Sequence, residues 1–151
     1  MHVNGGDLEA QLEAARMIDD WMNISYRAYN DITALRAALA KVQMPGESRD
    51  DLQSLDKELT ELQEGSNDAP GFGAVNRDVT RFVTMIQSAD IRPAKSIIEN
   101  VAPSCIALKN DLAHLRMLNQ EKLASLNKML RQGGLALVPV PTVPNDPRCP
   151  T

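Results

Sequence analysis

The stretch of sequence that decides the fold is PAKSIIENVAPSCIALKNDLAHLRMLNQEKLASLNKMLR, residues 93–131. Its apolar side chains recur in steps of three and four, which is the spacing of one face of an α-helix. They are Ile98, Val101, Cys105, Leu108, Leu112, Leu115 and Leu118, and the pattern resumes at Leu123, Leu126 and Leu130. Pro93 suits a first helical turn, and Gly133 and Gly134 form a stop signal. At 1.5 Å per residue, the predicted helix is roughly 58 Å long and needs partners of similar length.

Pro103 lies inside this predicted helix. An interior proline removes one backbone hydrogen bond and clashes with the preceding turn, at a cost of about 3 kcal/mol. The sequence is compatible with a kink that wraps one helix around its neighbours, and also with a break into helices 93–102 and 103–131. The kink is favoured, and both alternatives leave the rest of the architecture unchanged.

Three further helices are predicted before residue 93. Residues 7–43 contain neither Gly nor Pro and carry a second apolar stripe, which predicts another long helix. Leucines at helical spacing predict a shorter helix over residues 49–64, and a similar pattern predicts a fourth helix over residues 74–89. The two short helices are separated by a loop rich in Gly, Asn, Asp and Pro.

The final stretch, residues 135–151, has a different character. Five prolines forbid a helix there and favour extended or polyproline-like backbone. They are Pro139, Pro141, Pro144, Pro147 and Pro150. Apolar residues in the first half predict that this tail lies along the bundle, whereas the end from Asn145 onward is expected to be mobile.

These segments predict a single all-α domain. Its fold is an elongated, up-and-down four-helix bundle with two long and two short helices and an extended Pro-rich C-terminal tail. Residues 1–6 form a lead, residues 7–134 the bundle and residues 135–151 the tail. One arrangement stacks the two short helices end to end against the two long ones.

Composition argues against several classes of function. The formal net charge of −4 disfavours nucleic acid, because phosphate binding needs a concentrated basic face. No apolar run approaches the roughly 20 residues that a transmembrane helix requires, so no membrane span is expected. Residues 1–6 have neither the basic region nor the apolar region of a signal peptide.

No group of residues indicates a catalytic, cofactor or metal site. His2 and His114 are the only imidazoles, and no His-x-x-His, Glu-x-x-His or Cys-x-x-Cys spacing occurs. Cys105 lies on the apolar stripe, which favours a packing role over a nucleophilic one. A bridge between Cys105 and Cys149 and two unrelated thiols are both compatible with the sequence. We expect no enzyme activity from this chain alone.

Two groups of residues are candidates for binding surfaces. The aromatic residues Trp21, Tyr26 and Tyr29 flank the stripe of the first helix and could line a pocket for a small ligand. The carboxylates of Asp56, Glu58 and Glu61 lie in the acidic segment 49–64 and could contact a basic partner. This segment has a net charge of −4 and residues 93–131 have a net charge of +3, which favours adjacency of the two helices.

Three parts of the sequence resemble one known family. They are residues 8–12 continuing through 18–20 to 32–36, residues 74–79 with 85–90 and Pro93, and residues 123–130 with Gly133, Gly134 and Leu135. In this order they resemble the C-terminal helical domain of bacterial sortilin-like proteins. Those proteins carry BNR (Asp-box) repeats and are often labelled as glycosyl hydrolases.

The resemblance implies a non-catalytic accessory domain of an exported protein. In that family the β-propeller holds any substrate chemistry, and this chain has no Asp box, so no catalytic residue is carried over. The implied partners are an attached β-propeller, another protein or a second copy of the chain. The implied location is periplasmic or secreted, which fits a Cys105–Cys149 bridge. A free-standing helical adaptor that uses the acidic face and a small-ligand-binding bundle remain alternatives.

Overall fold

A computed structural model describes residues 5–44, 46–88 and 94–150, and these residues form helices and no strands. The helices are α1 (Gly5–Lys41), α2 (Glu47–Glu64), α3 (Phe72–Ser88), α4 (Ala94–Leu118), the π-helical turn η1 (Asn119–Leu123) and α5 (Ala124–Gln132). The predicted all-α fold is confirmed, and the helix ends lie within two residues of the predicted ones wherever they can be compared. The predicted helix ends at residues 89 and 93 lie outside the described residues.

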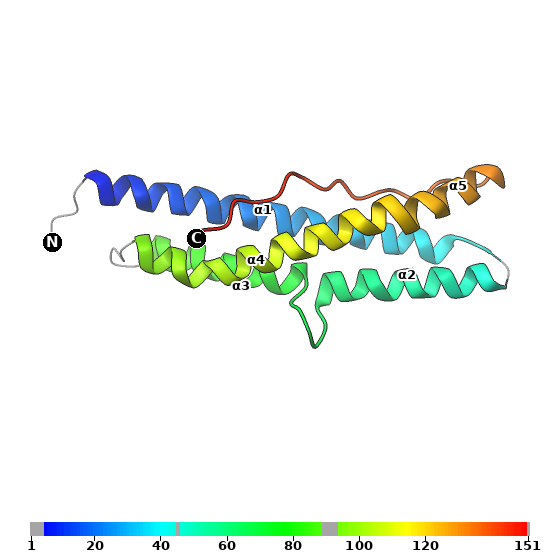
Figure 1. The fold of residues 1–151 in the computed structure, drawn as a ribbon, viewed down its shortest axis with the longest axis horizontal. Coiled ribbons are helices and arrows are strands. Elements are labelled where there is room, and N and C mark those ends of the chain that lie inside the picture. Colours follow the sequence, from blue (N-terminus) through cyan, green and yellow to red (C-terminus); the bar gives the residue numbers. More distant parts are fainter. Residues whose placement is uncertain (1–4, 45, 89–93, 151) are drawn as a thin grey trace.

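The molecule is an elongated bundle in which the short helices α2 and α3 lie end to end beside the long ones (Figure 1). Both short helices run in one direction, opposite to α1. The chain then returns through α4, η1 and α5, which join without an interruption in helical backbone. We call this continuous segment, residues 94–132, the last helix. The tail runs back along the outside of the bundle (Figure 1). The end-to-end arrangement of the short helices is therefore the one that the chain adopts.

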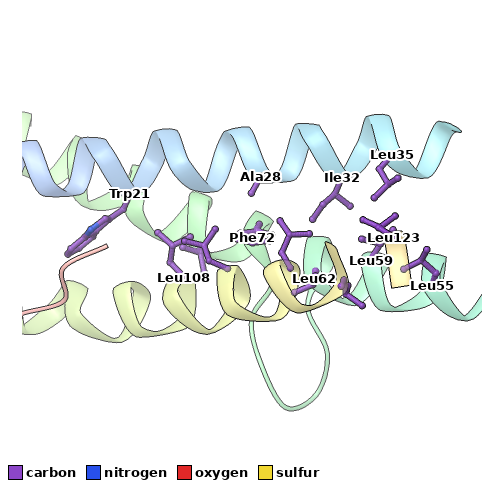
Figure 2. Packing of buried hydrophobic residues seen from close by; sticks show 14 of the residues in the cluster. Trp21, Ala28, Ile32, Leu35, Leu55, Leu59, Leu62, Phe72, Leu108 and Leu123 are labelled. Atoms are coloured by element: carbon purple, nitrogen blue, oxygen red, sulfur yellow. The ribbon is translucent and has the colours of Figure 1, made fainter. Parts of the chain in front are cut away.

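The core is a row of side chains along the whole bundle. Buried positions on α1 alternate in steps of four and three, which is the heptad spacing of helices that pack side by side. They are Ala14, Ile18, Trp21, Ser25, Ala28, Ile32, Leu35 and Leu39. Ile32 and Leu35 face Leu55 and Leu59 of α2 (Figure 2). Each buried Leu or Ile stabilises the fold by about 1.5–3 kcal/mol.

The last helix contains a π-helical turn that the sequence analysis did not predict. The apolar stripe advances by five residues between Leu118 and Leu123, and a regular α-helix would rotate Leu123 away from the core. The π-helical turn η1 occupies this interval, and both leucines are buried. An extra residue in the turn therefore restores the register of the stripe.

α4 continues through Pro103, which lies on its exposed side. The alternative of two separate helices, 93–102 and 103–131, is therefore wrong. On the solvent side of a helix the proline ring meets no packed neighbour. The energetic cost of Pro103 is therefore limited to the lost hydrogen bond and the clash within its own turn of helix.

The junction between α2 and α3 depends on a close backbone contact. A Cβ atom on Gly71 would lie 2.5 Å from the Gly65 nitrogen and 2.6 Å from the Leu62 carbonyl oxygen. Gly71 is buried, so only glycine allows the start of α3 to pack this closely on the end of α2.

A buried and a half-buried polar side chain fix the two short helices to α1. The Gln63 amide nitrogen donates to the Tyr29 carbonyl oxygen at 2.8 Å and to the Thr33 hydroxyl at 2.7 Å. Its amide oxygen accepts a hydrogen bond from Arg36 at 2.9 Å. On α3, Asn76 donates to the backbone of α1 at 3.0 Å. Because Gln63 and Asn76 have specific partners on α1, they define the register of the bundle.

Candidate functional site

Burial along the tail repeats every three residues. Val138, Pro141 and Pro147 are buried and Pro144 and Pro150 are half-buried, while the residues between them are exposed or half-buried. Three residues is the repeat of a polyproline II helix. One row of side chains of an extended, polyproline-like tail therefore lies against the bundle.

Side chains of the last helix hold the tail by its backbone. The Asn127 amide donates to the Val138 carbonyl oxygen at 3.2 Å and accepts from the Val138 nitrogen at 2.9 Å. Asn119, in the π-helical turn, donates to the Pro141 carbonyl oxygen at 2.8 Å. The Arg116 guanidinium donates to the Pro144 carbonyl oxygen at 3.2 Å. Two side-chain amides and one guanidinium therefore bind three tail residues that lie three positions apart.

The tail and the last helix have matching lengths. From Asn127 back to Cys105 is 22 helical residues, or roughly 33 Å at 1.5 Å per residue. From Val138 to Cys149 is 11 tail residues, or roughly 34 Å at 3.1 Å per residue in polyproline II geometry. The tail can therefore run antiparallel to this helix, from the Val138–Asn127 contact to the Cys149–Cys105 pair, without slack.

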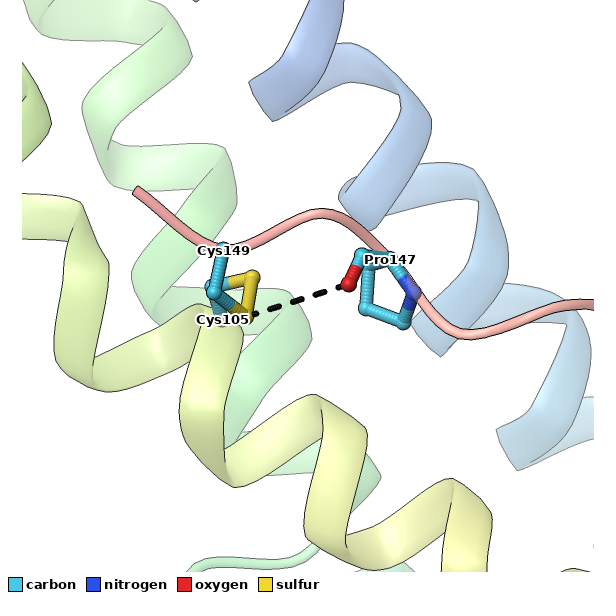
Figure 3. Close-up of a disulfide and its surroundings, with 3 residues drawn as sticks. All are labelled: Cys105, Pro147 and Cys149. Carbon is cyan, nitrogen blue, oxygen red and sulfur yellow. Dashed lines mark hydrogen bonds between the residues drawn. A yellow bond between two sulfur atoms is a disulfide. The ribbon is translucent and has the colours of Figure 1, made fainter. Parts of the chain in front are cut away.

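A disulfide between Cys105 and Cys149 fixes the far end of the tail to α4 (Figure 3). The two Cα atoms are 5.5 Å apart, and the bridge links positions 44 residues apart. The Pro147 carbonyl oxygen lies 4.0 Å from the Cys149 sulfur. A bridged sulfur carries no proton, so this is a contact and not a hydrogen bond. The prediction that the tail is mobile from Asn145 onward is therefore wrong for residues 145–150.

A groove of about 980 Å³ lies between α1 and the tail, and we call it the α1/tail groove. Trp21 and Pro147 are among its lining residues. One wall is formed by exposed or half-buried polar residues and one aromatic residue of α1: Asp20, Asn23, Tyr26, Arg27, Asn30 and Asp31. The other wall is formed by the tail residues Thr142, Pro144, Asn145, Asp146, Pro147 and Arg148. The groove is partly open to solvent.

The three aromatic residues singled out in the sequence lie in different surroundings. Trp21 is only 2% exposed and belongs to the core rather than to its edge. Tyr26 is 63% exposed and lines the α1/tail groove with Trp21. Tyr29 instead donates a hydrogen bond to Glu64 of α2 at 2.8 Å, and this acceptor carboxylate raises the pKa of the phenol. The three side chains therefore do not line one cavity.

Two of the three acidic residues singled out in α2 are paired within the chain. Asp56 binds Arg36 of α1 at 2.9 Å, and Glu58 binds Lys122 of η1 at 2.6 Å. The Glu61 side chain is exposed. The Glu58–Lys122 pair agrees with the predicted adjacency of the acidic and basic helices. The two ion pairs leave fewer unpaired carboxylates on α2 for a basic partner.

Asp111 of α4 is a buried carboxyl group, 7% exposed, and its Oδ2 atom has no hydrogen-bond partner among the described residues. Burial raises the pKa of this group from 3.8 to about 7. Asn119 Oδ1 is the other buried side-chain oxygen without a partner in the described part of the chain. Asp111 does not line the α1/tail groove.

In residues 5–44, 46–88 and 94–150, no three His, Cys, Asp or Glu side chains lie close enough together to hold a metal ion. His114 is exposed, and His2 lies outside the described residues. Over the same ranges, no helix combines the length and the apolar composition needed to cross a bilayer.

Comparisons with protein-family models, with curated proteins and with solved structures find no match for this chain. The resemblance to the sortilin-like helical domain therefore stays a prediction.

Sequence reasoning missed the side chains that clamp the tail and, apart from Tyr26, those that form the α1 wall of the groove. A signal was present in the proline spacing, because Pro141, Pro144, Pro147 and Pro150 recur every three residues. That spacing gives a polyproline II segment one continuous face of proline rings, which is suited to pack against a neighbouring helix. Asn119 and Asn127, beside the leucine stripe of the neighbouring helix, are then natural donors to its carbonyl groups.

Proposed function

We propose that this chain is a non-catalytic helical docking domain that binds another protein or domain along the α1/tail groove. The observation that carries the proposal is the groove itself, which combines an exposed aromatic ring, amide groups and both signs of charge on two walls. Interfaces of moderate affinity use this mixture, in which aromatic and Arg side chains supply most of the binding energy.

The bundle suits such a role because its groove is built on a fixed frame. One wall is a helix of 37 residues, and the other is a tail held by three side-chain clamps and a disulfide. A surface that is ordered before binding loses little conformational entropy when a partner docks.

We place the domain in a periplasmic or secreted protein, as an accessory to a BNR-repeat parent of the sortilin-like type. The Cys105–Cys149 bridge supports an oxidising compartment, because disulfides are rare in reducing ones. The sequence stretches quoted above support the type of parent. Asp-box repeats in the same reading frame, upstream of the codon for Met1, are the expected finding. A frame that encodes no β-propeller would contradict this parent.

Site-specific photo-crosslinking in the native host tests the docking role. A photoactivatable amino acid at position 30, in the groove, should give one discrete adduct that mass spectrometry identifies. The same amino acid at position 110, on an exposed part of α4 outside the groove, should give none. The proposal fails if position 30 gives no adduct, or if the purified chain hydrolyses glycosides by itself.

A further inference from the structure

We propose that the α1/tail groove binds an extended, proline-containing peptide in polyproline II conformation, which lies beside the tail as a second strand. This inference rests on the proposed docking role and specifies the chemistry of the partner. It is drawn from the way in which the chain already holds its own tail.

The α1 wall repeats the donor types that clamp the tail. On the last helix the clamps are two asparagines and one arginine: Arg116, Asn119 and Asn127. On α1 the groove is lined by Asn23, Arg27 and Asn30, whose side chains are exposed and form no hydrogen bond or ion pair with other described residues. Asparagine can donate to a carbonyl group and accept from an N–H group, as Asn127 does with Val138.

The spacing of these donors fits the repeat of the proposed ligand. Asn23 and Asn30 are seven residues apart on one helix face, or roughly 10.5 Å at 1.5 Å per residue. One turn of polyproline II is three residues and roughly 9.3 Å long. Two carbonyl groups one turn apart on the peptide can therefore meet the two asparagines, and Arg27 lies between them.

Tyr26 supplies the second element of polyproline recognition. Domains that bind such peptides dock proline rings on aromatic side chains, because the ligand is already extended and loses little entropy. Tyr26 is 63% exposed and lies on the groove wall between Asn23 and Arg27. Tyr29, by contrast, is held by Glu64 outside the groove lining. Tyr26 is therefore the ring available to a proline of the ligand.

A synthetic peptide with the tail's own sequence tests this inference. The probe is residues 138–150 with Cys149→Ser and a fluorescent label, titrated against the oxidised full-length chain by anisotropy. Saturable binding is expected. A Tyr26→Ala variant and an Asn23→Ala/Asn30→Ala variant should each weaken it by roughly tenfold, the equivalent of one or two lost contacts. Asn110→Ala, exposed but outside the groove, should leave binding unchanged.

A second peptide, in which every proline is replaced by alanine, tests for the polyproline conformation and should bind at least roughly tenfold more weakly. Absence of saturation at millimolar peptide would overturn the inference. Equal binding by the alanine peptide, or binding that the groove variants leave unchanged, would also overturn it. Circular dichroism of each variant confirms that the bundle is folded.

The two proposals can fail separately. A discrete crosslinked partner at position 30 without peptide binding would overturn the polyproline ligand and leave the docking role in place. Loss of both the adduct and the peptide complex would overturn both.

Discussion

Among the described residues, Asp111 is the carboxyl group that burial most strongly disfavours in its charged form. Its carboxyl group is buried, and burial raises its pKa from 3.8 to about 7. Because the pKa is higher in the folded state than in the unfolded state, the folded protein binds more protons between about pH 4 and pH 7. The contribution of Asp111 to the free energy of unfolding is therefore fully present below about pH 4 and is lost as the pH rises through 7.

We predict that Asp111→Asn stabilises the protein at pH 8 and has little effect at pH 4. Asparagine has the same shape and no charge, so it removes a desolvation penalty of about 1.4 kcal/mol per unit of pKa shift. The melting temperature at pH 8 should rise by several degrees. Asp19→Asn, at an exposed site on α1, is the control and should leave the pH dependence of melting unchanged. An Asp111→Asn protein that melts with the same pH dependence as the parent chain would contradict this account.

Asn127 is the residue that begins the alignment of the tail, because its amide satisfies both polar groups of Val138. We predict that Asn127→Ala costs about 1–2 kcal/mol locally, the value of two hydrogen bonds. Hydrogen exchange at the Val138 amide should then accelerate by roughly tenfold. Lys128→Ala, at the exposed neighbouring position, should not change that rate. Equal exchange in both variants would show that Asn127 does not hold the tail.

At the scale of elements, the π-helical turn shows how an irregular helix keeps a regular core. We predict that deletion of Gln120, an exposed residue of η1, is tolerated, because the five-residue step of the leucine stripe becomes four. Deletion of the exposed residue Lys109 instead rotates the following leucines by roughly 100° and should cost several kcal/mol. Thermal melts of the two deletion variants compare them directly. Equal destabilisation would mean that the turn has no role in register.

Most of the helical fold could be predicted because burial imposes a period of 3.6 residues on the sequence, and Gly and Pro mark the ends. The sequence analysis missed the π-helical turn, although the five-residue step of the apolar stripe from Leu118 to Leu123 indicates an irregular turn there. Apart from Trp21 and Tyr26, the groove lining could not be predicted, because most of its residues are polar side chains on a solvent face, where no periodicity is imposed. Asn23 and Asn30 can be recognised as groove residues only when the tail is seen beside α1.

At the scale of the whole molecule, the disulfide joins the last segment of the chain to the middle of a bundle that is already complete. In the chain-entropy model, closing a loop of 44 residues stabilises a fold by about 4 kcal/mol. We predict that Cys149→Ser lowers the free energy of unfolding in urea by up to this amount and leaves the helical content unchanged. Arg148→Ser, one residue earlier and exposed, should have a much smaller effect. Equal stability of the two variants would show that the bridge contributes little.

The most direct test of the tail as a fixed wall of the groove uses Trp21, the single tryptophan of the chain. Trp21 is 2% exposed and lines the groove together with Pro147. The measurement is acrylamide quenching of its fluorescence in the oxidised protein and after reduction of the disulfide. We predict protected, blue-shifted emission in the oxidised protein. After reduction, we predict stronger quenching and red-shifted emission at constant helical circular dichroism. Identical quenching in the two states would contradict a tail that covers Trp21 and depends on the Cys105–Cys149 bridge.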